Sequence, residues 1–382
     1  MIARLGDVAT YVNGYAFKPS DWSDIGLPII RIQDLTGNSY QANRYNGEYD
    51  KRYEIHDGDV LISWSASLGV YVWTGEKAVL NQHIFKVVFN KLEVDKSFFV
   101  HQVRNILENS VSQAHGATMK HLTKPVFDAL PFNLPSVVEQ QRISSVLDKL
   151  TDLISLRKQQ LSKLDELVKA RFVEMFGDPK VNPKGWKVIP LSEVINGTAS
   201  NGFFAKRDEY CEDGNVQILG VVNIVNRMYS NIINLPKTNG TTVDIKKYQV
   251  KYGDMLFCRS SLVKEGIGKA SIVPRDIPEN ILFECHVIRL PLNTSKCIPE
   301  FIQVLSTTPF FRNQIISQSK TATMTTISQD GILKSMIILP PIRLQQDFLN
   351  IVQKVDMSKL TIQQSLDKLE VLRKSLMQEY FG

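Results

Sequence analysis

The sequence predicts an α+β protein of two globular domains, each followed by a long α-helix, with the two helices paired as a coiled coil. Three observations predict this class. A segment recurs 205 residues further along the 382-residue chain, both copies carry apolar residues at coiled-coil spacing, and short apolar runs bounded by Gly, Pro, Asn or Asp precede each copy. A period of about 200 residues is too long for a solenoid, so it indicates duplicated domains.

The repeat consists of short motifs in a fixed order. The first copy contains Ala117-Thr118-Met119, Leu134-Pro135, Gln140-Gln141, Lys163-Leu164-Asp165 and Phe176-Gly177. The second contains Ala322-Thr323-Met324, Leu339-Pro340, Gln345-Gln346, Lys368-Leu369-Glu370 and Phe381-Gly382. Asn-Gly-aromatic turns at Asn13 and Asn201, and Gly-Asp pairs at Gly58 and Gly253, match at shorter offsets. The globular parts therefore have loops of variable length, whereas the tails have a fixed length.

In chain order, we expect a first globular domain at residues 1–133, a helical region at 134–178, a second globular domain at 179–338 and a second helical region at 339–382. Short strands are expected in each globular domain, with matching helical stretches near 97–111 and 299–316. Prolines precede each long helix, and Gly177 with the prolines beyond it ends the first. Each long helix should have roughly 37 residues and a length of about 55 Å.

The apolar positions of the two long helices differ in an informative way. Ile154 aligns with Lys359, Arg157 with Ile362 and Val168 with Arg373. A helix that packed against its own copy in a homodimer would bury like charges together, whereas two helices of one chain can offset them. We favour pairing within the chain and keep the homodimer as the alternative.

Composition places few limits on function. Hydrophobic residues make up 43% and charged residues 22%, as in ordinary globular domains, and no apolar run is long enough to span a membrane. The N-terminus lacks the pattern of a secretory signal, so we expect a cytoplasmic protein. The net charge of +6 permits an anionic partner such as nucleic acid without establishing one.

Several catalytic motifs are absent. Residues 264–270 end like a P-loop, but Val263 stands at the first glycine position and Ala270 at the Ser/Thr position. HExxH and GxSxG do not occur, nor does the Asn-Pro-Pro-Tyr/Phe motif of amino-methyltransferases. His83 and His286 align between the copies, and we assign both a structural role. We therefore expect a binding protein with no catalytic residue, cofactor or metal of its own.

Taken together, the repeated motifs resemble the specificity subunit of type I restriction-modification systems over essentially the whole chain. The resemblance implies two target-recognition domains, each reading half of a split double-stranded DNA sequence, and two antiparallel helices that dock two methyltransferase subunits. It also implies that S-adenosylmethionine, ATP and Mg belong to these and to added motor-nuclease subunits, which methylate adenine and cut unmodified DNA in phage defence. Longer loops in the second domain imply that the half-sites differ.

Side chains that read bases are usually donors or acceptors on loops held by a rigid frame. Three segments in each domain meet this description. The turns provide Asn13, Tyr15 and Lys18, and Asn201, Phe203, Lys206 and Arg207. The segments after the Gly-Asp strands provide Ser63, Trp64 and Ser65, and Arg259, Ser260 and Ser261. The Ala-Thr-Met loops provide Thr118, Lys120 and His121, and Thr323, Thr325 and Thr326. Arg259 is our first choice for a guanine contact.

Two other function classes remain open. The chain could be an orphan DNA-binding scaffold for a methyltransferase without a restriction partner, or an enzyme with unrecognised active residues. Neighbouring methyltransferase and motor-nuclease genes would favour the restriction system over the orphan scaffold.

Overall fold

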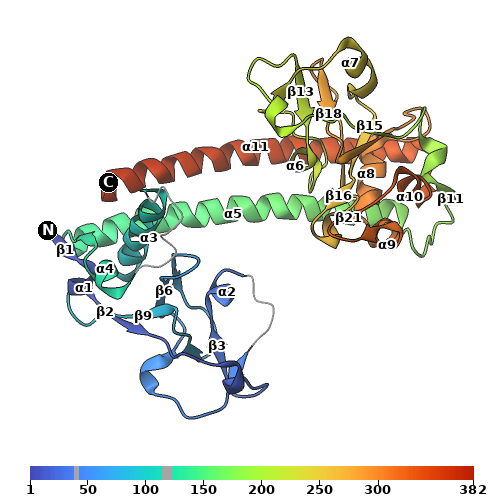
Figure 1. The fold of residues 1–382 in the computed structure, drawn as a ribbon. Helices are drawn as coiled ribbons and strands as arrows, with labels where there is room; N and C mark the ends of the chain where they lie inside the picture. Colours follow the sequence, from blue (N-terminus) through green and yellow to red (C-terminus); the bar gives the residue numbers. More distant parts are fainter. Residues whose placement is uncertain (38–42, 114–122) are drawn as a thin grey trace. The chain divides into compact units, whose positions relative to one another are not determined.

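The structure is a computed structural model that describes residues 1–37, 43–113 and 123–382. The chain forms two compact units, one made of Met1–Lys158 with Gln364–Gly382, the other of Gln159–Gln363 (Figure 1). Helices α5 (Val137–Phe176) and α11 (Ile342–Phe381) each contribute one part to each unit. Among the described residues, no helix is both long enough and apolar enough to cross a bilayer.

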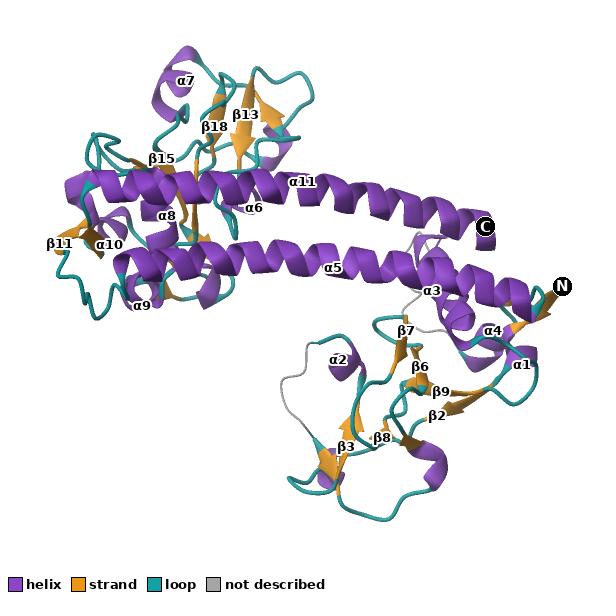
Figure 2. Cartoon of the chain, turned by 180° about the vertical axis from the view of Figure 1, so that it is seen from behind, coloured by secondary structure: helices purple, strands orange, loops and turns teal. Residues whose placement is uncertain are grey.

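The first unit contains two four-stranded sheets, in the orders β2-β9-β6-β7 and β4-β3-β8-β5, with strand β1 paired to β10. Figure 2 labels β2, β9, β6 and β7 of the first sheet and β3 and β8 of the second. Its strands are β1 Ile2–Arg4, β2 Thr10–Asn13, β3 Leu27–Ile30, β4 Arg44–Tyr45, β5 Glu54–Ile55, β6 Val60–Ser63, β7 Gly69–Val72, β8 Ala78–Leu80, β9 Ile84–Val88 and β10 Pro131–Asn133. Its helices besides α5 and α11 are α1 Leu5–Val8, α2 Ile32–Leu35, α3 Lys96–Gln113 and α4 Lys124–Asp128.

The second unit repeats this topology, with sheets β12-β19-β15-β17 and β14-β13-β18, strand β11 paired to β22, and an added sheet β16-β21-β20. Its strands are β11 Lys187–Pro190, β12 Ser200–Asn201, β13 Val216–Leu219, β14 Lys237–Thr238, β15 Asp254–Cys258, β16 Ser260–Ser261, β17 Ala270–Ile272, β18 Ile281–Phe283, β19 Val287–Pro291, β20 Lys320–Thr321, β21 Thr325–Thr326 and β22 Met336–Leu339. Its helices besides α5 and α11 are α6 Val221–Ile224, α7 Thr242–Tyr248, α8 Pro299–Thr307, α9 Pro309–Gln318 and α10 Gln329–Leu333. The β3–β8 and β13–β18 pairs are both parallel, so the sequence repeat is also a structural repeat.

The Gly-Asp pairs are turns that start the central strands β6 and β15. Gly58 and Gly253 have positive φ angles of 86° and 94°, which glycine adopts at little cost. The following carboxylates close the turns, since Asp59 accepts a hydrogen bond from the His56 amide and Asp254 accepts one from the Lys251 amide, both at 2.9 Å.

The Gln-Gln pairs attach the start of each long helix to its domain. Only the first glutamine of each pair is buried. Gln140 accepts a hydrogen bond from the Asp95 amide and donates to the Pro135 carbonyl. Gln345 makes the equivalent bonds to the Ile298 amide and the Pro340 carbonyl. Both motifs therefore fix the direction in which a helix leaves its sheet.

The two long helices pack antiparallel in each unit, which confirms the predicted fold class and the pairing within one chain. In the first unit, Lys158 pairs with Glu370 at 3.1 Å; in the second, Lys359 pairs with Asp165. Each helix has 40 residues, slightly more than predicted. Lys359, which replaces an apolar residue of the first copy, thus has its counter-charge on the other helix.

The Phe-Gly motifs end the helices inside hydrophobic cores. Phe176 is fully buried against Phe301 of α8 and Phe348 of α11, with ring centroids 4.8 and 5.6 Å away. Phe381 packs on Phe98 of α3 at 5.4 Å. The helix that leaves one domain therefore completes the core around the start of the other helix.

The helical stretch predicted near 299–316 is two helices. Pro309 occupies the first turn of α9 and Thr308 caps it, with the threonine hydroxyl accepting from the Phe311 amide at 3.4 Å. Because proline cannot continue a helix from the preceding residue, α8 ends at Thr307, whereas α3 in the first unit is continuous.

Candidate nucleic-acid interface

The Asn-Gly-aromatic turns lie where two backbone segments approach closely. A Cβ atom on Gly14 would lie 2.2 Å from the Asn81 carbonyl oxygen, and one on Gly202 would lie 2.2 Å from that of Glu284. The next residues, Tyr15 and Phe203, form parallel bridges to those same two partners. Packing therefore requires glycine at this position in both domains. The residues beside it in the sequence can differ between the domains.

In the first unit the turn carries an aromatic and basic surface. The Tyr15 side chain is 45% exposed, and its ring centroid lies 5.0 Å from Phe17 and 5.6 Å from Tyr53. The Arg52 guanidinium stacks over Tyr53 at 4.7 Å. Lys18 is exposed, and so is Asn13 at the end of β2. Aromatic rings and cations in this combination can contact bases and phosphates.

In the second unit the same turn is more basic. Lys206 and Arg207 are exposed, and the Lys206 amide donates to the Glu209 carboxylate at 2.7 Å. The Lys18 amide donates in the same way to Asp21, also at 2.7 Å. This hydrogen bond fixes the backbone of each lysine and leaves its ammonium group in solvent. Phe203 is half-buried against Tyr248, with centroids 5.8 Å apart.

The segments after the central strands differ between the units. In the first, Ser63 and Ser65 are buried, and the Ser63 hydroxyl donates to the Ser67 carbonyl, so both support the loop from inside. The Trp64 ring lies 5.5 Å from that of His83. In the second, Arg259 donates through Nη1 to the Cys285 carbonyl at 3.1 Å.

The Ala-Thr-Met loop of the second copy forms part of a small sheet. Thr325 and Thr326 in β21 pair with Ser261 and Ser260 in β16. Thr326 and Thr323 are exposed, whereas Thr325 is buried and shares a hydrogen bond of 3.0 Å with the Thr321 hydroxyl. In the first copy, Thr118, Lys120 and His121 lie outside the described residues.

One cavity in the second unit brings the three predicted segments together. It has a volume of about 550 Å³, and Asn201, Arg259 and Thr326 each contribute to it from a different segment. Its other lining residues are Gln318, Lys320, Ile327, Ser328, Gln329 and Asp330. Residues 125 positions apart in sequence thus form one polar, partly cationic surface of donors and acceptors.

Two residues that were not among the predicted site residues, His286 and Lys320, contact this surface. The His286 Nδ1 atom lies 2.7 Å from the Ser260 hydroxyl, and its carbonyl accepts from the Arg259 amide. Lys320 is exposed on β20 beside the threonines. The alignment of His83 with His286 could have indicated a site residue, but we assigned both histidines a structural role. No motif in the sequence distinguished Lys320.

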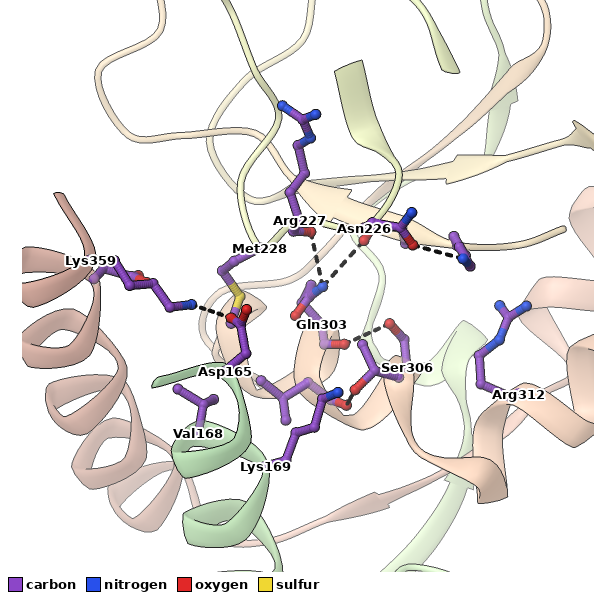
Figure 3. Close-up of a pocket in the computed structure, with 15 residues that line it drawn as sticks. Asp165, Val168, Lys169, Asn226, Arg227, Met228, Gln303, Ser306, Arg312 and Lys359 are labelled. Carbon is purple, nitrogen blue, oxygen red and sulfur yellow. Dashed lines mark hydrogen bonds and ion pairs between the residues drawn. The ribbon is translucent and has the colours of Figure 1, made fainter. Parts of the chain in front are cut away.

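Where the second domain meets the long helices, a cavity of about 380 Å³ is lined by both polar and apolar side chains, including Val168 and Met228 (Figure 3). Gln303 donates to the carbonyls of Arg227 and Ala270 at 3.2 and 3.3 Å, and Lys269 donates to Asn226 at 2.7 Å. Burial raises the pKa of Asp356 on α11. These bonds lie within the domain side of the cavity, whereas on its helix side Lys359 of α11 pairs with Asp165 of α5.

Three cysteine thiols and the distribution of metal-binding side chains bear on the chemistry of the described residues. Burial raises the pKa of the Cys258 and Cys285 thiols, and that of Cys297 to about 12, so these thiols are not activated nucleophiles. No group of three or more His, Cys, Asp or Glu side chains that could hold a metal ion occurs within residues 1–37, 43–113 and 123–382. Each unit instead presents one polar and basic surface, formed by turns and loops that its sheets hold in place.

Comparison with known proteins identifies the duplicated unit. A family model described as the type I restriction modification DNA specificity domain matches residues 1–166 and 183–371. The EcoBI specificity subunit of Escherichia coli is 23% identical over 99% of this chain and 84% of its own length. The MjaVIII specificity subunit of Methanocaldococcus jannaschii is 22% identical over 82% of this chain and 76% of its own. The crystal structure of a type I restriction-modification S subunit from M. genitalium has the same fold, with a TM-score of 0.55 at 13% identity, covering 100% of this chain and 96% of that one.

Proposed function

The chain belongs to the type I restriction modification DNA specificity family, and from this membership we propose that it is the DNA-recognition subunit of such a system. Each globular domain reads one half of a bipartite, asymmetric double-stranded DNA site. The antiparallel helices dock two methyltransferase subunits and, through them, motor-nuclease subunits. The observation that carries the proposal is that one DNA specificity domain matches twice, over a fold that is itself repeated.

The two reading surfaces differ, and this supports an asymmetric site. Trp64 follows the central strand of the first domain, and Arg259 takes the equivalent place in the second, with Lys320 and Thr326 nearby. A guanidinium can donate two hydrogen bonds to guanine in the major groove, whereas an indole ring cannot. The second half-site should therefore contain a guanine that Arg259 reads.

Domain boundaries and chemistry follow from the same proposal. The recognition domains are residues 1–133 and 179–338, and the docking regions are 134–178 and 339–382. The chain acts without catalytic groups, and S-adenosylmethionine, ATP and Mg are bound by the partner subunits. Its DNA substrate makes the cytoplasm its place of action. An orphan scaffold has no separate support, and the presence of a motor-nuclease gene beside this one would count against it.

The proposal is tested by producing the chain with its methyltransferase subunit and mapping methylated adenines across a genome. We expect a split recognition sequence. Exchange of residues 1–133 for the matching domain of another family member should change one half only, and exchange of 179–338 should change the other half. A change of both halves in either exchange would contradict the assignment of one half-site to each domain.

A further inference from the structure

The loop after strand β15 is longer than its counterpart in the first domain. Strands β15 and β17 pair up to Phe257 and Ala270, which leaves residues 258–269 between them, whereas β6 and β7 pair up to Ser63 and Gly69, which leaves only residues 64–68. The added residues include most of the P-loop-like sequence 264–270, which lacks the motif's first glycine and its Ser or Thr. They follow directly from Arg259, Ser260 and Ser261 of the candidate interface.

This added loop is fixed at its base. The Gly268 amide donates to the Cys258 carbonyl, and the Cys258 amide donates to the Lys269 carbonyl, both at 2.8 Å. Arg312 of α9 donates through Nη2 to the carbonyls of Glu265 and Ile267, at 3.2 and 2.6 Å. The loop is therefore held by the body of the domain.

Hydrophobic packing adds to these bonds. Ile267 is fully buried. Gly268 has a φ of +60°, and a Cβ atom there would lie 2.5 Å from Ile315 of α9. The loop thus sits on α9 with a side chain inserted and its backbone in direct contact.

The tip of the fixed loop exposes two adjacent aliphatic side chains, Leu262 at 82% and Val263 at 60%. A single exposed leucine needs no explanation. Here the two residues adjoin strand β16, whose Ser260 and Ser261 pair with the interface threonines. Lys264 and Lys320 are also exposed. The tip therefore carries two exposed aliphatic side chains next to serine and threonine hydroxyls and lysine ammonium groups.

We propose that Leu262 and Val263 are specificity-determining residues that contact thymine methyl groups in the major groove of the second half-site. The inference rests on the proposed function and adds an apolar reading element to it. Thymine alone presents a methyl group in that groove, and apolar side chains recognise it by contact. The surrounding lysines suit the phosphates on either side. The equivalent connection of the first domain, between β6 and β7, has only residues 64–68, so we expect this kind of reading in the second half-site.

The test replaces each thymine of the mapped second half-site by uracil, which lacks the methyl group, one position at a time. Binding by the complex of this chain with its methyltransferase is then measured for wild type, Leu262→Ala and Val263→Ala. Uracil at one or two positions should weaken wild-type binding about four- to tenfold. The variants should bind thymine DNA that much more weakly and no longer distinguish it from uracil DNA. Ile233→Ala, which removes a 69% exposed side chain elsewhere in the domain, should behave as wild type.

The outcomes separate this inference from the proposed function. If wild type methylates no specific sequence, the proposed function fails. If it does so and uracil has no effect at any position, or the second half-site contains no thymine, the inference is overturned. If the variants lose their methyltransferase subunit instead of their thymine preference, the tip contacts protein and the inference is likewise wrong.

Discussion

Gly202 lies in the Asn-Gly-aromatic turn of the second domain, where the backbone leaves no room for a side chain. The carbonyl oxygens of Phe283 and Glu284 both lie 2.2 Å from where a Cβ atom would be, and both belong to backbone that cannot rotate away. Gly202→Ala should therefore force the strands apart and lower the free energy of unfolding by about 1–3 kcal/mol. Chemical denaturation checks this prediction. Gly240→Ala is the control, because its nearest neighbours are side-chain atoms of Val216 at 3.3 Å, and an equal loss there would contradict the explanation.

The matched aspartates of the two Gly-Asp turns differ in their charge environment. Asp59 forms an ion pair with Lys86 at 2.9 Å, whereas Asp254 is buried and accepts only backbone hydrogen bonds among the contacts described. Burial raises the pKa of Asp254, despite opposing effects of the Lys251 amide and Arg289. The same turn therefore carries an ion-paired aspartate in one domain and a buried aspartate with a raised pKa in the other.

This difference predicts opposite effects of the same substitution. An acid with a raised folded pKa binds protons more tightly when folded, so its contribution to stability falls as pH rises from the unfolded to the folded pKa. Asp254→Asn removes that loss, so it should raise the melting temperature by roughly 2–4 °C at pH 7 and give little gain near pH 4. Asp59→Asn breaks an ion pair and should lower the melting temperature at pH 7. Thermal unfolding between pH 4 and 8 measures both, and a gain for Asp254→Asn that grew in acid would contradict the assignment.

At the scale of elements, each long helix depends on one buried glutamine. Loss of the Gln345 side chain would leave the Ile298 amide and the Pro340 carbonyl without partners inside the protein. Buried groups left in this state cost about 1–3 kcal/mol each. Gln345→Ala should therefore destabilise the second unit by about 2–4 kcal/mol, measured by denaturation. The exposed neighbour provides the control, since Gln346→Ala should change stability by less than about 0.5 kcal/mol.

The elements also show which features the sequence could predict. The apolar residues at coiled-coil spacing in the long helices include Ile143, Leu147, Val352 and Leu366, and these four are buried. Their positions could be predicted because a heptad pattern is a local signal. The break at Pro309 was also local and was overlooked. The roles within Gln140-Gln141 could not be predicted, because burial of the first glutamine depends on the Asp95 amide, which is brought there by the sheet.

The candidate site was less predictable than the fold for the same reason. Its segments could be chosen from the repeat, but Asn201, Arg259 and Thr326 meet only after strands β12, β15 and β21 have assembled. Residue type alone placed Ser63 and Ser65 at the interface, whereas they are buried. Lys320 reaches the cavity from a strand with no distinguishing motif.

At the scale of the whole molecule, we expect the length of the two long helices to set the distance between the proposed half-sites. Helix α5 has 40 residues, which corresponds to about 60 Å at 1.5 Å per residue. Half-sites read on one face of DNA lie about one turn, roughly 34–36 Å, apart. A change in helix length should therefore alter the unread spacer and leave both half-site sequences as they are.

The test duplicates Ser162–Asp165 in α5, which adds roughly 6 Å of rise and about 40° beyond one full turn. Such an insertion is a stutter that coiled coils accommodate by local unwinding. A second variant also duplicates Lys359–Ile362 in α11, the segment that carries the partner of Asp165, so that the two helices stay in register. At about 3.4 Å per base pair, the spacer should grow by one or two base pairs in methylation maps. The same four residues inserted between the exposed Glu212 and Asp213 should leave it unchanged. A fully active variant with lengthened helices and the original spacer would show that the helices do not set the distance.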